Sequence, residues 1–202
     1  MSAPSGLAEP GLAPDPTRAT DPGARGATVW FTGLPSAGKS TIAHALAERL
    51  RADGHRVQVL DGDEVRPHLS ADLGFSKDAR DVNVARIGWV ARLLASHGVV
   101  VLVPVIAPYA AARDAVRTAH QAAGVPFSEV YVSTPLDVAE GRDVKGLYAK
   151  ARRGEISGMT GIDDPYEPPA AAELVIDTAR VNLEEAVERS AEHLTDLLKR
   201  DR

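Results

Sequence analysis

Cysteine is absent from the 202-residue chain, which excludes a disulfide framework, a thiolate metal site and a catalytic cysteine. This absence fits a reducing compartment, so we expect a cytoplasmic protein. No apolar run reaches the ~18 residues that would indicate a membrane span, and we expect no membrane partner.

Aromatic side chains make up only 4% of the chain, too few to form a stacking platform along single-stranded nucleic acid. The formal net charge of −5 gives no basic footprint for such a partner either. We therefore expect no nucleic-acid binding. The histidines show no metal-ligand spacing, and we interpret them as surface or turn residues. They are His44, His55, His68, His97, His120 and His193.

The first 26 residues hold five Pro, five Ala and four Gly, and lack the charged start and apolar stretch of a secretion signal. We predict a disordered Pro/Ala/Gly-rich tail over residues 1–26. The remaining residues, 27–202, have the length of one domain with a sizeable core, and 44% of the chain is apolar.

A phosphate-binding loop pattern stands at the start of this domain. Residues 33–40 read G-x-x-x-x-G-K-S, between a β-prone run at 28–32 and a predicted helix at 41–51. A strand, a glycine-bounded loop and a helix direct backbone N–H groups and a helix N-terminus at an anion. The alternative is a chance glycine turn, which the flanking strand and helix disfavour. We therefore expect a bound nucleoside triphosphate. The loop residues expected to hold it are Gly33, Leu34, Pro35, Ser36, Ala37, Gly38, Lys39, Ser40 and Thr41.

Charged and polar side chains are expected to act on the bound phosphates. Lys39 would reach the β- and γ-phosphates, and the Ser40 hydroxyl would bind Mg²⁺ as the cofactor. Asp61 and Asp63 follow a predicted strand at 56–61, and ligands of open α/β sheets sit outside the carboxyl ends of the strands. Both are candidates for accepting the proton of an attacking hydroxyl and for an outer, water-mediated contact to Mg²⁺. The alternative is a simple Asp-Gly β-turn.

Strand-like and helix-like segments alternate along the domain. The segment 99–106 is nearly all apolar, as expected for a central parallel strand covered on both faces. The alternation predicts an α/β fold with three layers, a mostly parallel sheet of about five strands and helices on both faces. Predicted strands are 28–32, 56–61, 99–106, 127–132 and 173–177, and predicted helices are 41–51, 78–97, 109–123, 135–141 and 181–199.

Residues 142–169 differ in character from the rest of the domain, because basic residues, glycines and prolines are concentrated there. A long, basic, glycine-punctuated stretch over a phosphate site predicts a lid that closes on substrates. The basic side chains after Arg142 are Lys145, Lys150, Arg152 and Arg153.

GTPases, motor ATPases and small-molecule kinases all carry a phosphate loop. This chain has no Asn-Lys-x-Asp guanine-reading motif and no long insertion for mechanical coupling, which favours a kinase. Arg66 and Arg80 follow the second predicted strand, where they could hold an anionic acceptor by bidentate contacts. Phe75 between them could stack on a base. The alternatives are solvated surface arginines and an aromatic that anchors the core.

Several segments of the domain are more specific than the phosphate-binding loop. They are residues 61–66 (Asp-Gly-Asp-Glu-Val-Arg), 72–76 (Asp-Leu-Gly-Phe-Ser), 80–83 (Arg-Asp-Val-Asn), 142–148 (Arg-Asp-Val-Lys-Gly-Leu-Tyr), 150–152 (Lys-Ala-Arg), 154–156 (Gly-Glu-Ile) and 160–169 (Thr-Gly-Ile-Asp-Asp-Pro-Tyr-Glu-Pro-Pro). Together they resemble the adenylylsulfate (APS) kinase family over about residues 27–198, which implies a three-layer P-loop kinase fold. The resemblance implies transfer of the ATP γ-phosphate to the ribose 3′-hydroxyl of APS, which gives PAPS and ADP.

The resemblance also implies roles at the matching positions. Asp61 would be the catalytic carboxylate with Asp63 in support, Lys145 would lie near the transferring charge, and Arg142 would lie on the ATP side. Phe75 would stack on the adenine of APS. The implied catalytic residues are Lys39, Asp61, Asp63 and Lys145, and the implied APS-binding residues are Asp63, Arg66, Phe75, Arg80, Asn83, Ile106, Lys145, Leu147 and Met159.

Three positions depart from the family pattern. Many members have serine at Ala107, a residue regarded as a phosphorylated intermediate, so transfer here would go directly from ATP to the acceptor. Many have arginine at Ala110, and phenylalanine is common at Met159, where it forms the second ring of an adenine clamp. Loss of an aromatic pair would weaken the clamp by about 0.5–1.5 kcal/mol, which tunes affinity without abolishing it.

Two alternatives to an APS kinase stay open. The first is a family member redirected to another nucleotide or small hydroxylated acceptor, which Met159 and Ala110 would favour. The second is a nucleotide-binding module without catalysis, which the intact Lys39, Asp61 and Lys145 disfavour. The expected partners are ATP and APS as small-molecule substrates. The family often forms dimers, which implies a homodimer.

Overall fold

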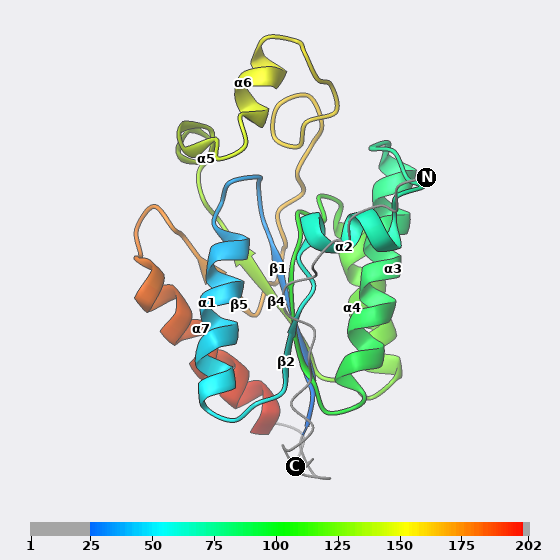
Figure 1. The fold of residues 1–202 in the computed structure, drawn as a ribbon, viewed down its shortest axis with the longest axis vertical. Helices are drawn as coiled ribbons and strands as arrows, with labels where there is room; N and C mark the ends of the chain where they lie inside the picture. The colour runs from blue at the N-terminus through cyan, green and yellow to red at the C-terminus, as the bar shows by residue number, and fades with distance from the viewer. Residues whose placement is uncertain (1–24, 200–202) are drawn as a thin grey trace, which may run out of the picture.

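The computed structural model describes residues 25–199, so the predicted tail lies outside the described residues except for its last two positions. Figure 1 shows the fold. The strands are β1 (Ala27–Thr32), β2 (Val57–Val59), β3 (Val100–Pro104), β4 (Phe127–Val132) and β5 (Leu174–Ile176). The helices are α1 (Lys39–Ala52), α2 (Gly62–Leu69), α3 (Lys77–Ala95), α4 (Ala110–Ala122), α5 (Leu136–Arg142), α6 (Leu147–Arg152) and α7 (Leu183–Lys199).

The five strands form one parallel sheet in the order β2-β3-β1-β4-β5. This confirms the predicted sheet, and every residue of β3 is buried, as its apolar run predicts. Because all strands run in the same direction, their carboxyl ends meet at one edge. The loops that follow β1, β2, β3 and β5 therefore gather at that edge.

Helices cover both faces of the sheet, which gives three layers (Figure 1). Successive side chains of β1 point to opposite faces, as strand geometry requires. Val29 and Phe31 pack in the cluster that includes α1 and α7, whereas Trp30 packs in the cluster that includes α3. Between α3 and α4 the approach is close, since a Cβ added to Gly88 would lie 2.6 Å from a methyl of Val116.

Several predicted boundaries shift by a few residues, and local hydrogen bonds explain two of the shifts. The strand predicted over 56–61 gives way to α2 because the Asp61 side chain accepts a hydrogen bond from the backbone N–H of Asp63 and caps that helix. The helix predicted from residue 181 begins at Leu183, because the Asn182 side chain accepts from the backbone N–H of Glu185. The short helices α2 and α6 were not predicted.

The segment 142–169, here called the lid, stands beyond the carboxyl edge of the sheet (Figure 1). It has a small apolar cluster in which Tyr148 and Met159 pack with Ala139 of α5. Asp163 shapes its loop by accepting hydrogen bonds from the backbone N–H groups of Gly158 (2.7 Å) and Met159 (2.6 Å). Closure of this lid on substrates stays a prediction.

The interpretation of all six histidines as surface or turn residues is wrong for His120. Its ring is fully buried on α4, where Nδ1 donates to the Val116 carbonyl at 2.8 Å and Nε2 lies 3.0 Å from the Thr28 hydroxyl of β1. Burial lowers the pKa of His120, although the hydrogen bond to Val116 acts in the opposite direction. The buried face of α4 accommodates a polar side chain at this position because Thr28 in the sheet supplies a hydroxyl partner.

Candidate active site

The phosphate-binding loop, residues 33–41, joins β1 to α1. Gly33 and Gly38 have φ of +152° and +103°, and a Cβ on Gly33 would lie 2.5 Å from the Val132 carbonyl oxygen. These two positions therefore require glycine. The loop wraps around Lys39, whose ammonium donates hydrogen bonds to the carbonyls of Gly33 (3.0 Å) and Leu34 (2.7 Å).

Lys39 is 8% exposed, so its ammonium is a largely buried cation beside the loop. Burial lowers the pKa of Lys39 to about 8, and the nearby carboxylates of Asp61 and Asp63 oppose that shift. A negatively charged ligand beside the ammonium would stabilise its charged form. The loop thus combines backbone N–H groups at the start of α1 with a buried cation.

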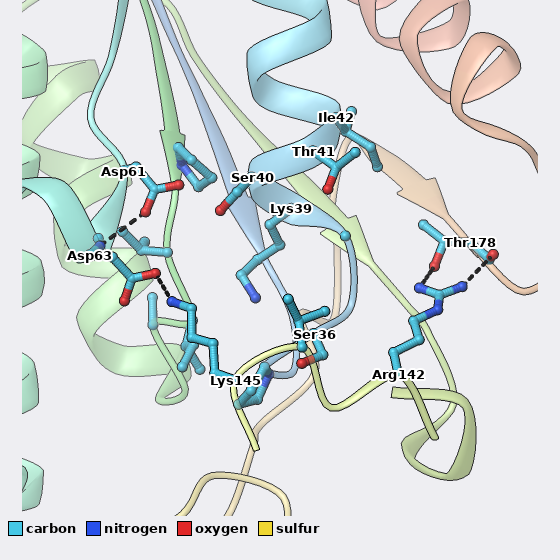
Figure 2. Close-up of a pocket in the computed structure, with 18 of the residues that line it drawn as sticks. Ser36, Lys39, Ser40, Thr41, Ile42, Asp61, Asp63, Arg142, Lys145 and Thr178 are labelled. Atoms are coloured by element: carbon cyan, nitrogen blue, oxygen red, sulfur yellow. Dashed lines mark hydrogen bonds and ion pairs between the residues drawn. The ribbon is translucent and has the colours of Figure 1, made fainter. Parts of the chain in front are cut away.

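The acidic pair predicted to face this loop does so. Asp61 is 5% exposed and stands at the N-cap of α2, while Asp63 lies in the first turn of α2 and is exposed to solvent. The Asp63 carboxylate forms an ion pair with Lys145 of the lid, so the pair joins the two sides of the site (Figure 2). The alternative interpretation, a simple Asp-Gly β-turn, does not describe this segment fully, because the Asp61 side chain caps α2.

A cleft of about 820 Å³ unites most of the predicted residues. It is lined on the side of the phosphate-binding loop by Pro35, Ser36, Gly38, Lys39, Ser40, Thr41 and Arg142. On the opposite side it is lined by Asp61, Asp63, Arg66, Phe75, Arg80, Asn83, Ile106, Lys145 and Leu147. Figure 2 shows Ser40 and Lys39 between Asp61 on one flank and Arg142 on the other.

Four predicted residues do not line this cleft. Gly33, Leu34 and Ala37 belong to the loop but serve its packing: Leu34 contacts the lid cluster, and the Ala37 carbonyl accepts from Thr178 at 3.0 Å. Met159 is 6% exposed and buried inside the lid. The predicted contact of Met159 with the acceptor stays a prediction. Asp163 accepts hydrogen bonds from the backbone N–H groups of Gly158 and Met159.

Arg66 and Phe75 form one unit on the side of the cleft opposite the phosphate-binding loop. The Arg66 guanidinium lies 4.3 Å from the centre of the Phe75 ring and donates to the carbonyls of Leu73 (3.0 Å) and Gly74 (2.5 Å). Phe75 is 65% exposed, so it does not anchor the core. The Arg80 guanidinium lies 5.9 Å from the centre of the same ring, so this exposed aromatic side chain stands beside two cations.

Arg80 and Asn83, both on α3, complete this side. Arg80 donates to the Phe75 carbonyl (2.9 Å), to the Thr160 hydroxyl (3.0 Å) and to the Gly158 carbonyl. The guanidinium therefore ties the lid to α3. The Oδ1 atom of Asn83 is buried without a hydrogen-bond partner in the described part of the chain. An unpaired buried acceptor at a cleft wall fits a ligand that donates to it.

The cleft extends past Arg142 to a region that the sequence did not predict. Arg142 donates to the Thr178 hydroxyl (2.8 Å) and carbonyl (2.9 Å), and the first turn of α7 closes the wall. The signal for Thr178 was present, because it follows a predicted strand at the same sheet edge. The residues missed are Thr178, Val181, Asn182, Leu183 and Ala186.

Two of the unusual positions lie at the turn after β3. Ala107 is buried with φ +43°, and its carbonyl accepts from Arg113 at 2.7 Å. The backbone N–H of Ala110 begins α4 and donates to the Glu167 carboxylate at 2.7 Å. The side chains of Arg113 and Glu167 hold this turn through its backbone groups, and residue 107 carries no hydroxyl.

The site fits a magnesium ion that arrives with a nucleotide. Within residues 25–199 no group of three or more His, Cys, Asp or Glu side chains could hold a metal. The Ser40 hydroxyl and two carboxylates offer hard oxygen atoms at one end of the cleft. Mg²⁺ usually takes one or two protein ligands together with phosphates and water, which suits this set.

A loop of this type between β1 and α1, facing carboxylates across a cleft at the carboxyl edge of a parallel sheet, defines a P-loop phosphotransferase. Residues 25–177 match the family model of adenylylsulphate kinase. The chain therefore belongs to the adenylylsulphate kinase family, and it is a kinase. None of the described helices combines the length and the apolar character needed to cross a membrane.

Similar proteins come from several organisms. A probable adenylyl-sulfate kinase of Synechocystis sp. is 54% identical over 173 residues, which cover 86% of this chain and 96% of the relative. The structure of the Mycobacterium tuberculosis APS kinase CysC in complex with AMPPNP and APS is 47% identical, with a TM-score of 0.79, covering 87% and 98% of the two chains. A hexameric APS kinase from Thiobacillus denitrificans is 41% identical, with a TM-score of 0.64 and coverage of 86% of this chain and 29% of that chain.

Proposed function

We propose that this protein transfers the γ-phosphoryl group of ATP to the ribose 3′-hydroxyl of APS, which gives PAPS and ADP. The proposal rests on one observation: the phosphate-binding loop and the Arg66–Phe75 unit line opposite sides of the same cleft. Phosphoryl transfer depends mainly on positioning and on charge neutralisation. The cleft offers surfaces for both reactants.

On the nucleotide side, the loop backbone and Lys39 would hold the β- and γ-phosphates of ATP. Ser40 would bind the Mg²⁺ that accompanies ATP, and this ion would neutralise charge on the phosphates. Arg142 and Thr178 would lie beside the base, where the first turn of α7 closes the cleft. The buried ammonium of Lys39 would gain an oppositely charged partner when the phosphates bind.

On the acceptor side, Phe75 would stack on the adenine of APS, with Arg66 behind the ring. Arg80 would hold the phosphosulfate region through charge-assisted hydrogen bonds. Asn83 would contribute through its Nδ2 amide, because phosphate and sulfate oxygens only accept hydrogen bonds. Ile106 and Leu147 would supply apolar walls.

Between the two sides, Asp61 would accept the proton of the attacking hydroxyl. Its burial and its cap hydrogen bond to Asp63 hold the carboxylate in one orientation. Asp63 and Lys145 would act as a pair, with Lys145 moving toward the transferring charge when the acceptor binds. Because Ala107 carries no hydroxyl, transfer would be direct, without a phosphoenzyme at that position.

A second candidate is transfer to another nucleotide or small hydroxylated acceptor. It is favoured by Met159, which packs inside the lid, and by Ala110, which supplies no cation. A nucleotide-binding module without catalysis is a third candidate, against which the buried Lys39 and Asp61 argue. Turnover of APS compared with other acceptors separates these candidates.

A homodimer is our proposal for the assembly. Val82, Trp89 and Leu93 are exposed apolar side chains spaced by seven and four residues, so they share one face of α3. A relative is hexameric, which supports self-association within the family. Light scattering should give twice the monomer mass, and Trp89→Glu should give the monomer; a monomeric unmodified chain contradicts the proposal.

A cytoplasmic location stays a prediction from the cysteine-free composition.

Separate substitutions test the two sides of the cleft. Arg142→Ala should raise the KM for ATP at least about tenfold and leave the KM for APS nearly unchanged, since one charged hydrogen-bonding group is worth about 1.5–3 kcal/mol. Arg66→Ala should raise the KM for APS and not that for ATP. Equal effects of both substitutions on both substrates would contradict this division.

A further inference from the structure

Arg113 of α4 lies behind the cleft wall that follows β3. Its side chain is 2% exposed, and it is not among the residues that line the cleft. All three nitrogen atoms of the guanidinium donate hydrogen bonds: Nε to Oε1 of Glu129 on β4 (2.6 Å), Nη1 to the Ala107 carbonyl (2.7 Å) and Nη2 to the Glu167 carbonyl (2.7 Å). One buried cation thus joins the sheet, the turn after β3 and the end of the lid.

The turn after β3 forms one wall of the cleft, which Ile106, Ala107 and Pro108 all line. Ala107 has a φ of +43°, in the left-handed region that residues other than glycine disfavour, so this conformation persists only where neighbouring groups hold it. The carbonyl of Ile106 accepts from the Thr32 hydroxyl at 2.6 Å, and the carbonyl of Pro108 accepts from the backbone N–H of Glu167 at 2.8 Å. The guanidinium bond at residue 107 lies between these two and therefore acts on the strained residue itself.

The ion pairs around Arg113 do not by themselves explain its bonds to the backbone. Glu129 is 5% exposed and also accepts from Nη2 of Arg117 at 3.2 Å, and Arg117 in turn donates to Glu173 at 2.9 Å. The hydrogen bonds of Arg117 thus go to carboxylates, whereas two of the three Arg113 bonds go to carbonyls. A buried ion pair is weak evidence for stability, but the rigid fork of a guanidinium can hold several acceptors in one fixed arrangement.

We propose that Arg113 is a positioning residue for the acceptor. It acts through the turn: it holds Ala107 in the left-handed conformation, so that Ile106 keeps its place in the wall opposite the phosphate-binding loop. The bond to Glu167 keeps the end of the lid against the same wall. The contribution of Arg113 is therefore to acceptor binding and not to the chemical step. This inference rests on the proposed function, in which Ile106 contacts the acceptor.

Steady-state kinetics of the full chain with MgATP and APS test the proposal through the two KM values. Arg113→Lys keeps a positive charge beside Glu129 but lacks the fork that reaches both carbonyls. The KM for APS should rise about tenfold, the lower limit for losing one hydrogen bond that involves a charged group, while kcat and the KM for ATP stay within about twofold. Arg117→Lys makes the same exchange in the same ion network, so it is the matched control and should leave both KM values unchanged.

The strain at residue 107 gives a second readout, which a merely stabilising arginine would not affect. Glycine adopts a positive φ readily, so in an Ala107→Gly background the exchange Arg113→Lys should raise the KM for APS only about threefold or less. If Arg113→Lys does not fold, the paired exchange Arg113→Met with Glu129→Gln takes its place. This exchange leaves no unpaired buried carboxylate, but it still removes the donor to both carbonyls, so it should raise the KM for APS alone.

The supporting result is a higher KM for APS alone, which is absent in Arg117→Lys and smaller in the Ala107→Gly background. The role of Arg113 is overturned if its folded variants keep the KM for APS or if the KM values for both substrates rise together. It is also overturned if Arg117→Lys acts in the same way or if Ala107→Gly leaves the effect unchanged. These outcomes leave the proposed function standing as long as the unmodified chain phosphorylates APS. If the unmodified chain does not, the proposed function fails and this inference with it.

Discussion

The guanidinium of Arg80 on α3 donates a 3.0 Å hydrogen bond to the hydroxyl of Thr160 in the lid. A second bond goes to the Gly158 carbonyl, so the cation is partly satisfied by the lid itself. The same side chain lines the cleft where an anionic acceptor would bind. Arg80 therefore links the position of the lid to the acceptor site.

Removal of this link should affect both the lid and the acceptor. We expect Arg80→Ala to raise the KM for APS about tenfold or more, because charge-assisted hydrogen bonds are worth about 1.5–3 kcal/mol. Trypsin should also cut the ligand-free lid faster at its exposed basic residues. Thr160→Val, the control, removes one lid contact and keeps the cation, so it should speed proteolysis and change the KM little. Unchanged proteolysis in both variants would rule out the link.

The buried Lys39 predicts a pH dependence of nucleotide binding. Its pKa of about 8 in the empty site means that the ammonium loses its proton as the pH rises through 8, whereas bound phosphates favour the charged form. ATP affinity should therefore fall above pH 8, by up to about tenfold per pH unit for one linked proton. Calorimetric titrations between pH 7 and 9.5 measure this slope. Lys39→Ala should bind weakly and without the slope, and a slope that persists in this variant would assign it to another group.

The buried His120 predicts a loss of stability in weak acid. Because its pKa is lowered in the folded chain, the unfolded chain takes up the proton first as the pH falls below about 6.5. The free energy of unfolding should decrease from there down to the lowered pKa, by at most about 1.4 kcal/mol per pH unit. His120→Gln should flatten this part of the urea-derived profile. The idea fails if both profiles have the same slope between pH 7 and 5.

The contact between α3 and α4 predicts a penalty for a single methyl group. Gly88→Ala brings a Cβ to within 2.6 Å of Val116 Cγ2, and such overpacking costs about 1–3 kcal/mol. Alanine would otherwise favour the helix, so the sign of the change in unfolding free energy is diagnostic. In the double variant with Val116→Ala, the methyl should fit, and Gly88→Ala should no longer be destabilising. Equal penalties in both backgrounds would mean that the two residues do not interact.

Local patterns were sufficient to predict the framework of the site. The phosphate-binding loop depends on Gly33 and Gly38, whose torsions are set by the residue type, and the apolar run of β3 identified the centre of the sheet. The parallel direction of the strands then placed Asp61 opposite Lys39 without any further information.

Long-range packing determined what the sequence did not predict. Met159 packs with Ala139 and Tyr148, a contact that no periodicity in the sequence indicates. His120 is buried because Thr28, 92 positions away, supplies a hydroxyl.

Formation of PAPS and ADP by the purified chain with MgATP and APS tests the proposed reaction most directly. We expect robust, stoichiometric production of both products, and its loss in Lys39→Ala and in Asp61→Ala, while each variant keeps its fold by circular dichroism. If the chain binds ATP but forms no PAPS, while another hydroxylated acceptor is phosphorylated, the assignment of APS as acceptor is contradicted.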